Sequence, residues 1–206
     1  MDLRQQRTRR SIINAFLALR SEKPLEKITV RELTDKAVIH KATFYLHYHD
    51  IYELSESLEE EVINDVLTGL SDPTQLLTDT ERFNEELYCL LMAHESLLSI
   101  LYSGSRAGML AVRLEKRLKE YIFSRHPDYR DDLEKNVILT YLIHGAYHAY
   151  MHYRGGDTKT VLLMIDKMAA TVLKLYTVGG EPAVQQEQSR EEPEEKKEDT
   201  AKAESV

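Results

Sequence analysis

Apolar residues recur along nearly the whole of this chain at intervals of three and four residues, which is the spacing of one face of an α-helix. Stretches in which apolar and polar residues alternate, as they do in a half-buried strand, are nearly absent. Glycine, which weakens regular elements, occurs only eight times in 206 residues. The spacing therefore predicts an all-α protein.

Capping and breaking residues divide this pattern into separate helices. Thr29-Val30-Arg31-Glu32 and Asp50-Ile51-Tyr52-Glu53 each read as a capping box, in which side chains satisfy free amides where a helix begins. Breaks are expected near Pro24, Pro73, Pro127 and Gly155-Gly156. The helices expected between these signals cover residues 8–20, 30–37, 40–48, 51–70, 80–103 (interrupted near 93–94), 105–125, 130–154 and 158–177.

The first three expected helices are short and the later ones are long, which divides the chain into two helical units and a tail. We expect residues 1–50 to form a three-helix helix-turn-helix module and residues 51–178 to form a larger bundle. Residues 179–206 are rich in Pro, Glu, Gln, Lys and Ser and lack large apolar side chains. Because such a segment buries too little surface to offset its ordering entropy, the sequence predicts a disordered acidic tail.

The formal net charge of −8, taken alone, argues against a polyanionic partner. The charge is unevenly distributed, however: residues 1–49 contain ten basic and five acidic residues, whereas residues 181–206 contain nine acidic and four basic ones. Four of the basic residues, Arg4, Arg7, Arg9 and Arg10, lie in the first ten positions. The N-terminal module is therefore where a nucleic acid is expected to bind.

The single cysteine, Cys89, excludes an intramolecular disulfide framework and a zinc site built from cysteines. No cation flanks Cys89, so a buried and inert thiol is expected. The N-terminus lacks the apolar core of a signal peptide. The longest uncharged stretch, residues 136–153, holds three histidines and a glycine, which make it a poor membrane span. The sequence predicts a cytoplasmic protein without a membrane segment.

The second and third expected helices can form a helix-turn-helix, in which the second of the two lies in the major groove of DNA. On a helical wheel Phe44, Tyr48 and Ile51 share the inward face, which leaves Ala42 and Leu46 at the centre of the outward face. The small Ala42 lets the backbone approach base edges, and Leu46 can contact a thymine methyl group. Candidate donors to phosphate oxygens flank this face or begin the two helices: Thr29, Arg31, Lys41, Thr43, Tyr45 and His47.

The segments TVRELTDKA (29–37) and KATFYLHY (41–48) resemble the DNA-binding signature of the TetR family of bacterial transcriptional regulators. The Thr-Phe-Tyr-x-His-Tyr run, followed by Glu53-Leu54, is the most specific part, and the motif resemblance covers about residues 8–60. The resemblance implies an α-helical homodimer that binds a palindromic operator and usually represses until a small ligand enters the C-terminal bundle. It also implies phosphate or base contacts from Thr29, Arg31, Lys41, Thr43, Tyr45 and His47.

Two positions depart from the family pattern. The turn between the two helices usually contains Gly, and here it contains Val38, which is not indifferent to a positive φ. The family often has a phosphate-contacting Lys near the start of the fourth helix, where this chain reads His49-Asp50-Ile51. The loss of that cation is expected to weaken binding to the DNA backbone and to flatten its salt dependence by about one charge.

Three histidines, His144, His148 and His152, lie four residues apart and share one stripe of a helix, with tyrosines in adjoining positions. A pair of them could bind a metal, but the acidic base of an H-E-x-x-H site is missing. We interpret the stripe as a packing surface, because His and Tyr can bury ring area and keep a polar tip satisfied. No metal or other cofactor is predicted. By resemblance to the helix pair that joins TetR-like dimers, the interface is expected to include Tyr141, His144, Gly145, His148, His152, Val161, Ile165 and Met168.

A small-molecule effector is expected to bind inside the middle of the bundle. The candidates are chosen by residue type, as aromatic residues and methionines with few charges near them, and the same pattern is more often plain core. They are Phe83, Tyr88, Met92, Tyr102, Met109, Tyr121 and Tyr141.

The leading interpretation is a dimeric, sequence-specific regulator that binds double-stranded DNA and acts as a repressor. One alternative is a protein–protein coregulator that keeps the TetR-like scaffold but has lost DNA binding, which Val38 and the missing Lys allow. The other is an enzyme built on the histidine stripe. The sequence contains no recognisable nucleophile–base pair and no recognisable phosphate-binding loop, so it predicts that the protein is not an enzyme.

Overall fold

The computed structural model describes residues 3–153 and 155–178, and the predicted tail lies outside these ranges. The described residues form α-helices and short 3-10 turns without any strand, which confirms the all-α prediction. The α-helices are α1 (Leu3–Glu22), α2 (Val30–Ala37), α3 (Lys41–Tyr45), α4 (Ile51–Thr68), α5 (Thr80–Ala93), α6 (Glu95–Leu101), α7 (Met109–Arg125), α8 (Leu133–Tyr153) and α9 (Thr158–Val178). The 3-10 turns are η1 (Leu25–Lys27), η2 (Pro73–Leu77), η3 (Gly104–Arg106) and η4 (Pro127–Tyr129).

Local side-chain caps explain where α2 and α4 begin. The Oγ1 of Thr29 accepts a hydrogen bond from the N–H of Glu32 at 3.3 Å, and the carboxylate of Asp50 accepts one from the N–H of Glu53 at 2.8 Å. These are the two predicted N-caps. The Glu32 side chain does not complete its box, because its carboxylate pairs with Lys23 instead.

Most other helix boundaries also follow the breaking residues, and the predicted interruption is present at His94, between α5 and α6. The largest errors in the predicted bounds are at three helices. Helix α1 begins at Leu3 rather than at residue 8, α3 has five residues instead of the nine predicted over 40–48, and α7 begins at Met109 rather than at residue 105. Because α3 ends at Leu46, the residues after it can form a turn that leads to Asp50. Asp50 has an extended backbone and precedes α4.

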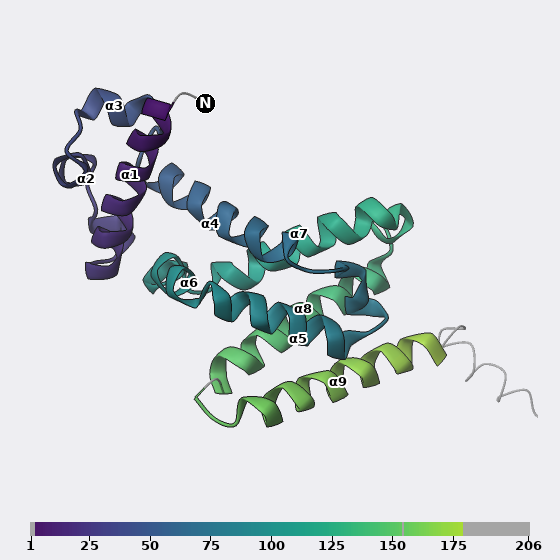
Figure 1. Cartoon of the computed structure of the whole chain (residues 1–206). Helices are drawn as coiled ribbons and strands as arrows, with labels where there is room; N and C mark the ends of the chain where they lie inside the picture. The colour runs from purple at the N-terminus through teal and green to yellow at the C-terminus, as the bar shows by residue number, and fades with distance from the viewer. Residues whose placement is uncertain (1–2, 154, 179–206) are drawn as a thin grey trace, which may run out of the picture.

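Helices α1, α2 and α3 form a small lobe at one end of the molecule, and α4 leads from it into the body (Figure 1). In the body, α8 packs between α7 and α9, and α5 packs against α9. None of the helices in the described part of the chain is long and apolar enough to cross a membrane.

Two apolar cores hold the molecule together. The first contains Phe16, Leu33 and Phe44 of the small lobe and runs without a break to Leu54 on α4 and Leu101 on α6. The second lies at the other end of the body and is built from α5, η2, α7 and α8 together with one residue of α9. Because the first core is shared, the small lobe cannot turn freely on the body without losing apolar contacts.

Candidate nucleic-acid interface

The turn between α2 and α3 is tight and has an unusual backbone conformation. Val38, its central residue, has φ 56° and ψ 49°, the left-handed region, and is the one non-glycine residue with positive φ among the described residues. The N–H of Ile39 donates to the carbonyl of Thr34 at 3.0 Å, which closes the C-terminus of α2. The turn therefore adopts the geometry that Gly would allow, and Val38 bears the steric cost.

Helix α3 has the two faces that its sequence predicts. Phe44 is fully buried, and the ring of Tyr48 packs against it with the two centroids 6.0 Å apart. On the opposite side Tyr45 is 54% exposed and Leu46 is 85% exposed, and Ala42 is exposed between them. Such exposure of a large aliphatic side chain beside a tight turn leaves the outward face open to a partner.

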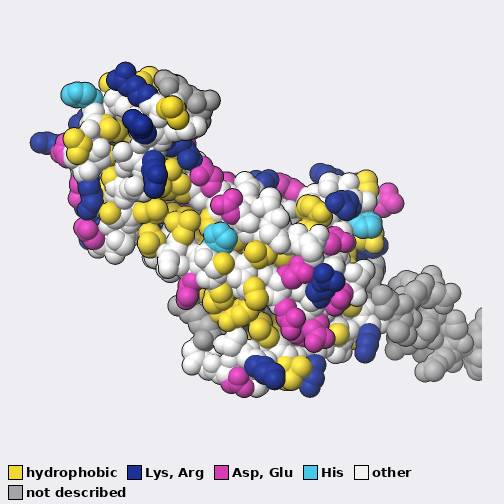
Figure 2. All heavy atoms as spheres, viewed as in Figure 1, with side chains coloured by type: hydrophobic (Ala, Val, Ile, Leu, Met, Phe, Trp, Pro, Cys, Tyr) yellow, Lys and Arg dark blue, Asp and Glu magenta, His cyan; other side chains and the backbone are white. Residues whose placement is uncertain are grey.

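All eight residues predicted to contact DNA lie in the small lobe and are exposed or half-exposed. Arg31 forms only a long contact with Asp35, 3.9 Å, and both side chains are largely in solvent. An exposed pair of this kind contributes little to stability, so Arg31 is available to a ligand. In the view of Figure 2, Lys and Arg side chains gather on the small lobe, whereas acidic side chains are prominent over the body. The contacts themselves remain predictions for Thr29, Arg31, Lys41, Ala42, Thr43, Tyr45, Leu46 and His47.

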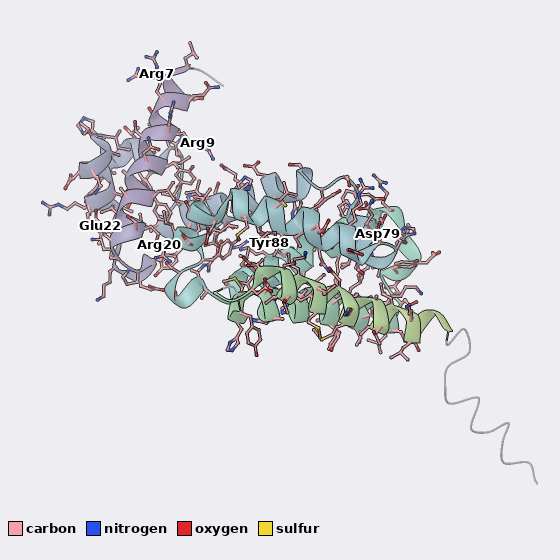
Figure 3. All side chains as sticks on the ribbon, turned by 60° about the horizontal axis from the view of Figure 1, so that its bottom comes forward. Arg7, Arg9, Arg20, Glu22, Asp79 and Tyr88 are labelled. Carbon is pink, nitrogen blue, oxygen red and sulfur yellow. The ribbon has the colours of Figure 1, made fainter. Side chains whose placement is uncertain are left out.

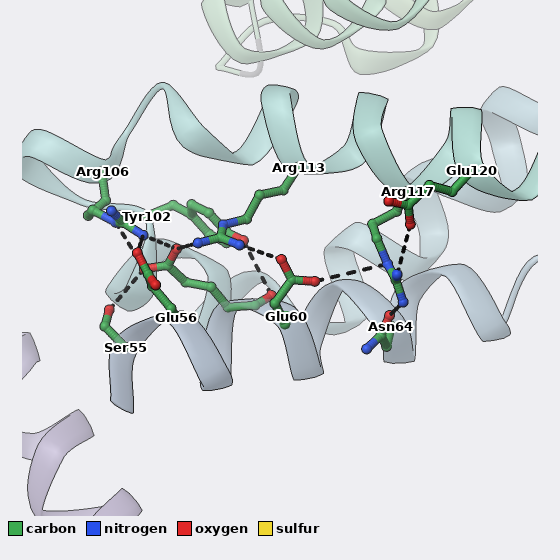
Figure 4. A network of polar contacts seen from close by, with 10 residues as sticks. Ser55, Glu56, Glu60, Asn64, Tyr102, Arg106, Arg113, Arg117 and Glu120 are labelled. Atoms are coloured by element: carbon green, nitrogen blue, oxygen red, sulfur yellow. Dashed lines mark hydrogen bonds and ion pairs between the residues drawn. The ribbon is translucent and has the colours of Figure 1, made fainter. Parts of the chain in front are cut away.

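A buried ionic network fixes α4 to the neighbouring helices of the body (Figure 4). The sequence analysis did not predict this network. Glu59, on α4, is fully buried and lies between two arginines, accepting from Nε of Arg106 at 3.0 Å and pairing with Arg113 of α7 at 3.0 Å. Its hydrogen bonds to Glu59 raise the pKa of the Arg106 guanidinium. Arg113 also binds Glu60, and Arg117, one turn further on, binds Asn64.

The segment before α7 also contacts the small lobe. Arg20, buried on α1, donates from its Nη2 to the carbonyl of Ser103 at 2.9 Å, and the hydroxyl of Ser105 donates to Glu26 in η1. Burial lowers the pKa of Arg20, and the negative charge of Glu26 opposes that effect. Figure 3 shows Arg20 on the part of α1 that lies against the body. The segment from Ser103 to Arg106 therefore contacts α1, η1 and α4 at once.

One sequence signal could have revealed part of this network. Ser55 and Glu59 occupy positions within the apolar stripe formed by Leu54, Leu58 and Val62, where a charged side chain is out of place. A carboxylate at such a position needs a buried cation, because an unpaired buried charge is strongly unfavourable. The partner could not be identified from the sequence, since both arginines lie about fifty residues further along the chain.

An apolar cavity lies inside the body between α5, α7, α8 and α9. Its volume of about 60 Å³ is enough for a few water molecules only. Tyr88 and Tyr150 form one wall, with their ring centroids 5.4 Å apart, and Leu114 and Leu118 of α7 form another. The single side-chain amide in the lining belongs to Asn84, whose Nδ2 donates to Asp166 at 2.6 Å.

Two of the seven predicted effector residues, Phe83 and Tyr88, line this cavity. The other five do not. Met92 lies beyond the lining and accepts a hydrogen bond from Tyr150, and Tyr102 is buried against the ionic network, where burial raises its hydroxyl pKa well above the usual value. Residue type alone selected these positions, and it does not indicate which side of a helix faces the cavity. The remaining three residues lie in the first core, in a separate surface cleft beside α4, and on the outer side of α8: Met109, Tyr121 and Tyr141.

The outer sides of α8 and α9 expose an unusual number of apolar side chains. Val137 and Tyr141 are each 59% exposed on α8, and Met164 and Met168 are each 48% exposed on α9. Of the predicted interface residues, those that are exposed or half-exposed are Tyr141, His144, Gly145, His148, His152, Val161 and Met168. Ile165 is the exception, because it is buried and lines the cavity, which corrects its assignment to an interface.

His144 has a carboxylate partner on another helix. Its Nε2 lies 2.9 Å from a carboxylate oxygen of Glu115 on α7. Burial opposes ionisation of Glu115, but hydrogen bonds from Lys119, Thr140 and His144 outweigh it and lower the pKa of Glu115 to about 2. No cluster of three or more His, Cys, Asp or Glu side chains suited to a metal ion occurs in the described residues.

Cys89, expected to be a buried thiol, is exposed on α5, so that prediction was wrong. Leu87 and Leu90, beside Cys89 in the sequence, pack against the second core, whereas Cys89 faces solvent. A run of apolar residues does not by itself place every member inside.

A solved structure shares this arrangement of helices. The protein, from Shewanella sp. PV-4, is described as a "putative tetR family transcription regulator", and it matches with a TM-score of 0.53 over 81% of this chain and 95% of that chain, at 11% sequence identity. The chain has a TetR-like fold. No protein-family model matches the sequence. No curated protein matches it either.

Proposed function

We propose that this protein is a transcriptional regulator that binds double-stranded DNA in a sequence-specific manner, with residues 1–50 as its DNA-binding domain. The observation that carries the proposal is the outward face of α3, which is exposed at Ala42, Tyr45 and Leu46 although the rest of the helix is held by a buried Phe44. A helix presented in this way can enter the major groove and read base edges. The fold shared with a described transcription regulator supports this function.

Polar residues on both sides of α3 fit contacts to the DNA backbone. Thr29 and Arg31 lie at the exposed start of α2, where free amides and the helix dipole favour a phosphate. Lys41, Thr43 and His47 supply further donors around α3. These residues and Tyr45 position the helix, whereas Ala42 and Leu46, at the centre of its outward face, read base edges.

The functional unit in this proposal is a cytoplasmic homodimer formed through the exposed sides of α8 and α9. A two-fold dimer presents two copies of α3 to successive major grooves about 34 Å apart, so the operator is a near-palindrome. The body, residues 51–178, then serves both for dimer formation and for binding an effector.

A small apolar effector in the cavity would weaken DNA binding and so relieve repression. Because the cavity holds only a few water molecules, a ligand must push apart the helices that line it, including α7 at Leu114 and Leu118. Helix α7 is tied to α4 through Arg113 and Glu59, and α4 leads directly into the small lobe. A cavity ligand that leaves operator affinity unchanged would contradict this step.

Selection from a random duplex library, followed by anisotropy titration of the recovered sequence, tests the proposal. The Tyr45→Ala variant is expected to bind the selected duplex about 100-fold more weakly, since one contact is lost in each half-site. Tyr121→Ala, which alters a half-buried tyrosine on α7, serves as the control and is expected to bind normally. If no sequence is enriched and no binding occurs at low salt, the protein is a coregulator on the same scaffold.

A further inference from the structure

Carboxylates surround the start of α4 at the edge of the small lobe. His49 is exposed there, and its N–H donates to the carboxylate of Glu53. Asp50 caps the same helix. Two carboxylates, both at the start of α4, therefore lie where the TetR family often has a phosphate-contacting Lys.

The first turns of α1 carry positive charge that the fold does not use. Arg7 and Arg10 are exposed, and within the described residues neither forms an ion pair. They lie three residues apart on the side of α1 away from its buried residues Ile12 and Phe16. Arg9, between them in sequence, is different because it pairs with Glu61 on α4.

The side chains close to Arg9 indicate that the first turns of α1 lie beside α3. Burial raises the pKa of the Tyr48 hydroxyl, and the Arg9 guanidinium close to it opposes that rise. Tyr48 follows α3 directly, so the turn of α1 that contains Arg7, Arg9 and Arg10 lies near the C-terminal end of α3. Figure 3 labels Arg7 at the end of α1 that points away from the body.

We propose that Arg7 and Arg10 bind DNA phosphates beside the groove occupied by α3, and supply the positive charge that the start of α4 lacks. The inference rests on the proposed function, because it assumes that α3 docks on DNA. Two unpaired arginines on one short face repel each other and add nothing to the packing of the lobe. Their arrangement is explained by a polyanion that approaches this face.

The salt dependence of DNA binding tests the proposal, because each neutralised phosphate contributes a slope of about −0.9 to a plot of log K against log salt concentration. In a dimer the Arg7→Gln/Arg10→Gln variant loses four such contacts and is expected to flatten the slope by about 3.6. Between about 50 and 200 mM NaCl the affinity of the variant should therefore change about 100-fold less than that of the natural protein. The probe is the duplex selected by the natural protein, and a mixed-sequence duplex of the same length is measured beside it.

Lys116→Gln, which removes one exposed positive charge from α7, is the control and is expected to leave the slope unchanged. Sequence preference should survive in Arg7→Gln/Arg10→Gln, since phosphate contacts carry no sequence information. If the natural protein binds the duplex and the double variant keeps the full slope, the inference is wrong while the proposed function stands. If the natural protein binds neither duplex at low salt, both fail.

Discussion

At the turn that joins α2 to α3, Val38 holds a left-handed backbone that β-branched residues rarely adopt. Its side chain is 89% exposed, so no packing compensates for the strain. The hydrogen bonds that close α2 and the anchoring of Phe44 in the core fix the turn instead. A strained residue of this kind, next to α3, shows that the turn geometry is determined by its surroundings rather than by the residue in it.

Val38→Gly is therefore expected to raise the free energy of unfolding by about 0.5–1 kcal/mol. Relief of the left-handed strain contributes about 1–2 kcal/mol, and the greater freedom of Gly in the unfolded chain removes part of it. Urea unfolding followed by circular dichroism measures the difference. Val38→Ala serves as the comparison, because Ala keeps most of the strain. A Gly variant less stable than the Ala variant would contradict this account.

Glu115 provides a second test, through pH. Its pKa of about 2 in the folded protein lies below its ordinary value of 4.5, so its ionised form stabilises the fold above pH 4.5 and that contribution is lost as the pH falls towards 2. Glu115→Gln is expected to cost about 1–3 kcal/mol at neutral pH, because Lys119 and His144 lose a charged partner. The difference between variant and natural protein should shrink on acidification from pH 4.5. An equal difference at pH 7 and pH 3 in urea titrations would refute the assignment.

Among the helices, α4 is the element through which the body and the small lobe affect each other. It shares the first core with α1, and its Glu59 is fixed by arginines from η3 and α7. The segment from Ser103 to Arg106 contacts α1 as well. Any movement of α7 must then either carry α4 and the small lobe with it or break buried ionic contacts, and the latter is costly.

Glu59→Gln is expected to reduce the free energy of unfolding by about 3–5 kcal/mol, because it leaves the Arg106 and Arg113 charges without a buried counterion. Glu60→Gln is the matched control on the next residue. The Glu60 side chain also binds Arg113 but is 36% exposed, compared with 0% for Glu59, so its loss should cost about 1 kcal/mol or less. Chemical unfolding measures the free energy of unfolding of both variants. A similar loss of stability in the two would show that burial of Glu59 is not what makes the network strong.

The sequence predicted the elements better than their contacts, for physical reasons. Caps such as Thr29 and Asp50 act within one turn, so their effect can be read locally. The side of a long helix that faces inward depends on which helices pack against it, and α9 illustrates this: Ile165 lines the cavity whereas its neighbour Met164 is half in solvent. The exposed face of α3 was predictable because that helix has a single apolar side. The buried network was not, because its charges come from distant parts of the chain.

At the scale of the whole molecule, the exposed apolar sides of α8 and α9 are difficult to explain in an isolated chain. Val137 and Tyr141 follow one another four residues apart, as do Met164 and Met168, so each helix carries an apolar stripe on its outer side. The first core already fixes one lobe to its own body, which makes a rigid protomer. In the proposed dimer, two such protomers joined through these sides would hold two copies of α3 at a defined separation, as the proposed two-fold operator requires.

Met168→Glu is expected to convert the proposed dimer to a monomer at micromolar concentration, because burying a carboxylate in the joined interface is costly. Sedimentation equilibrium measures the change. Val112→Glu is the control, since Val112 is 46% exposed on α7, outside the α8–α9 surface, and its substitution should leave the dimer intact. Affinity for a duplex with both half-sites should fall at least about 100-fold in the Met168 variant, whereas affinity for a single half-site should be unchanged, because only the linkage between the two sites is lost. A natural protein that sediments as a monomer, or a Met168 variant that remains a dimer, would show that the α8–α9 surface has another role.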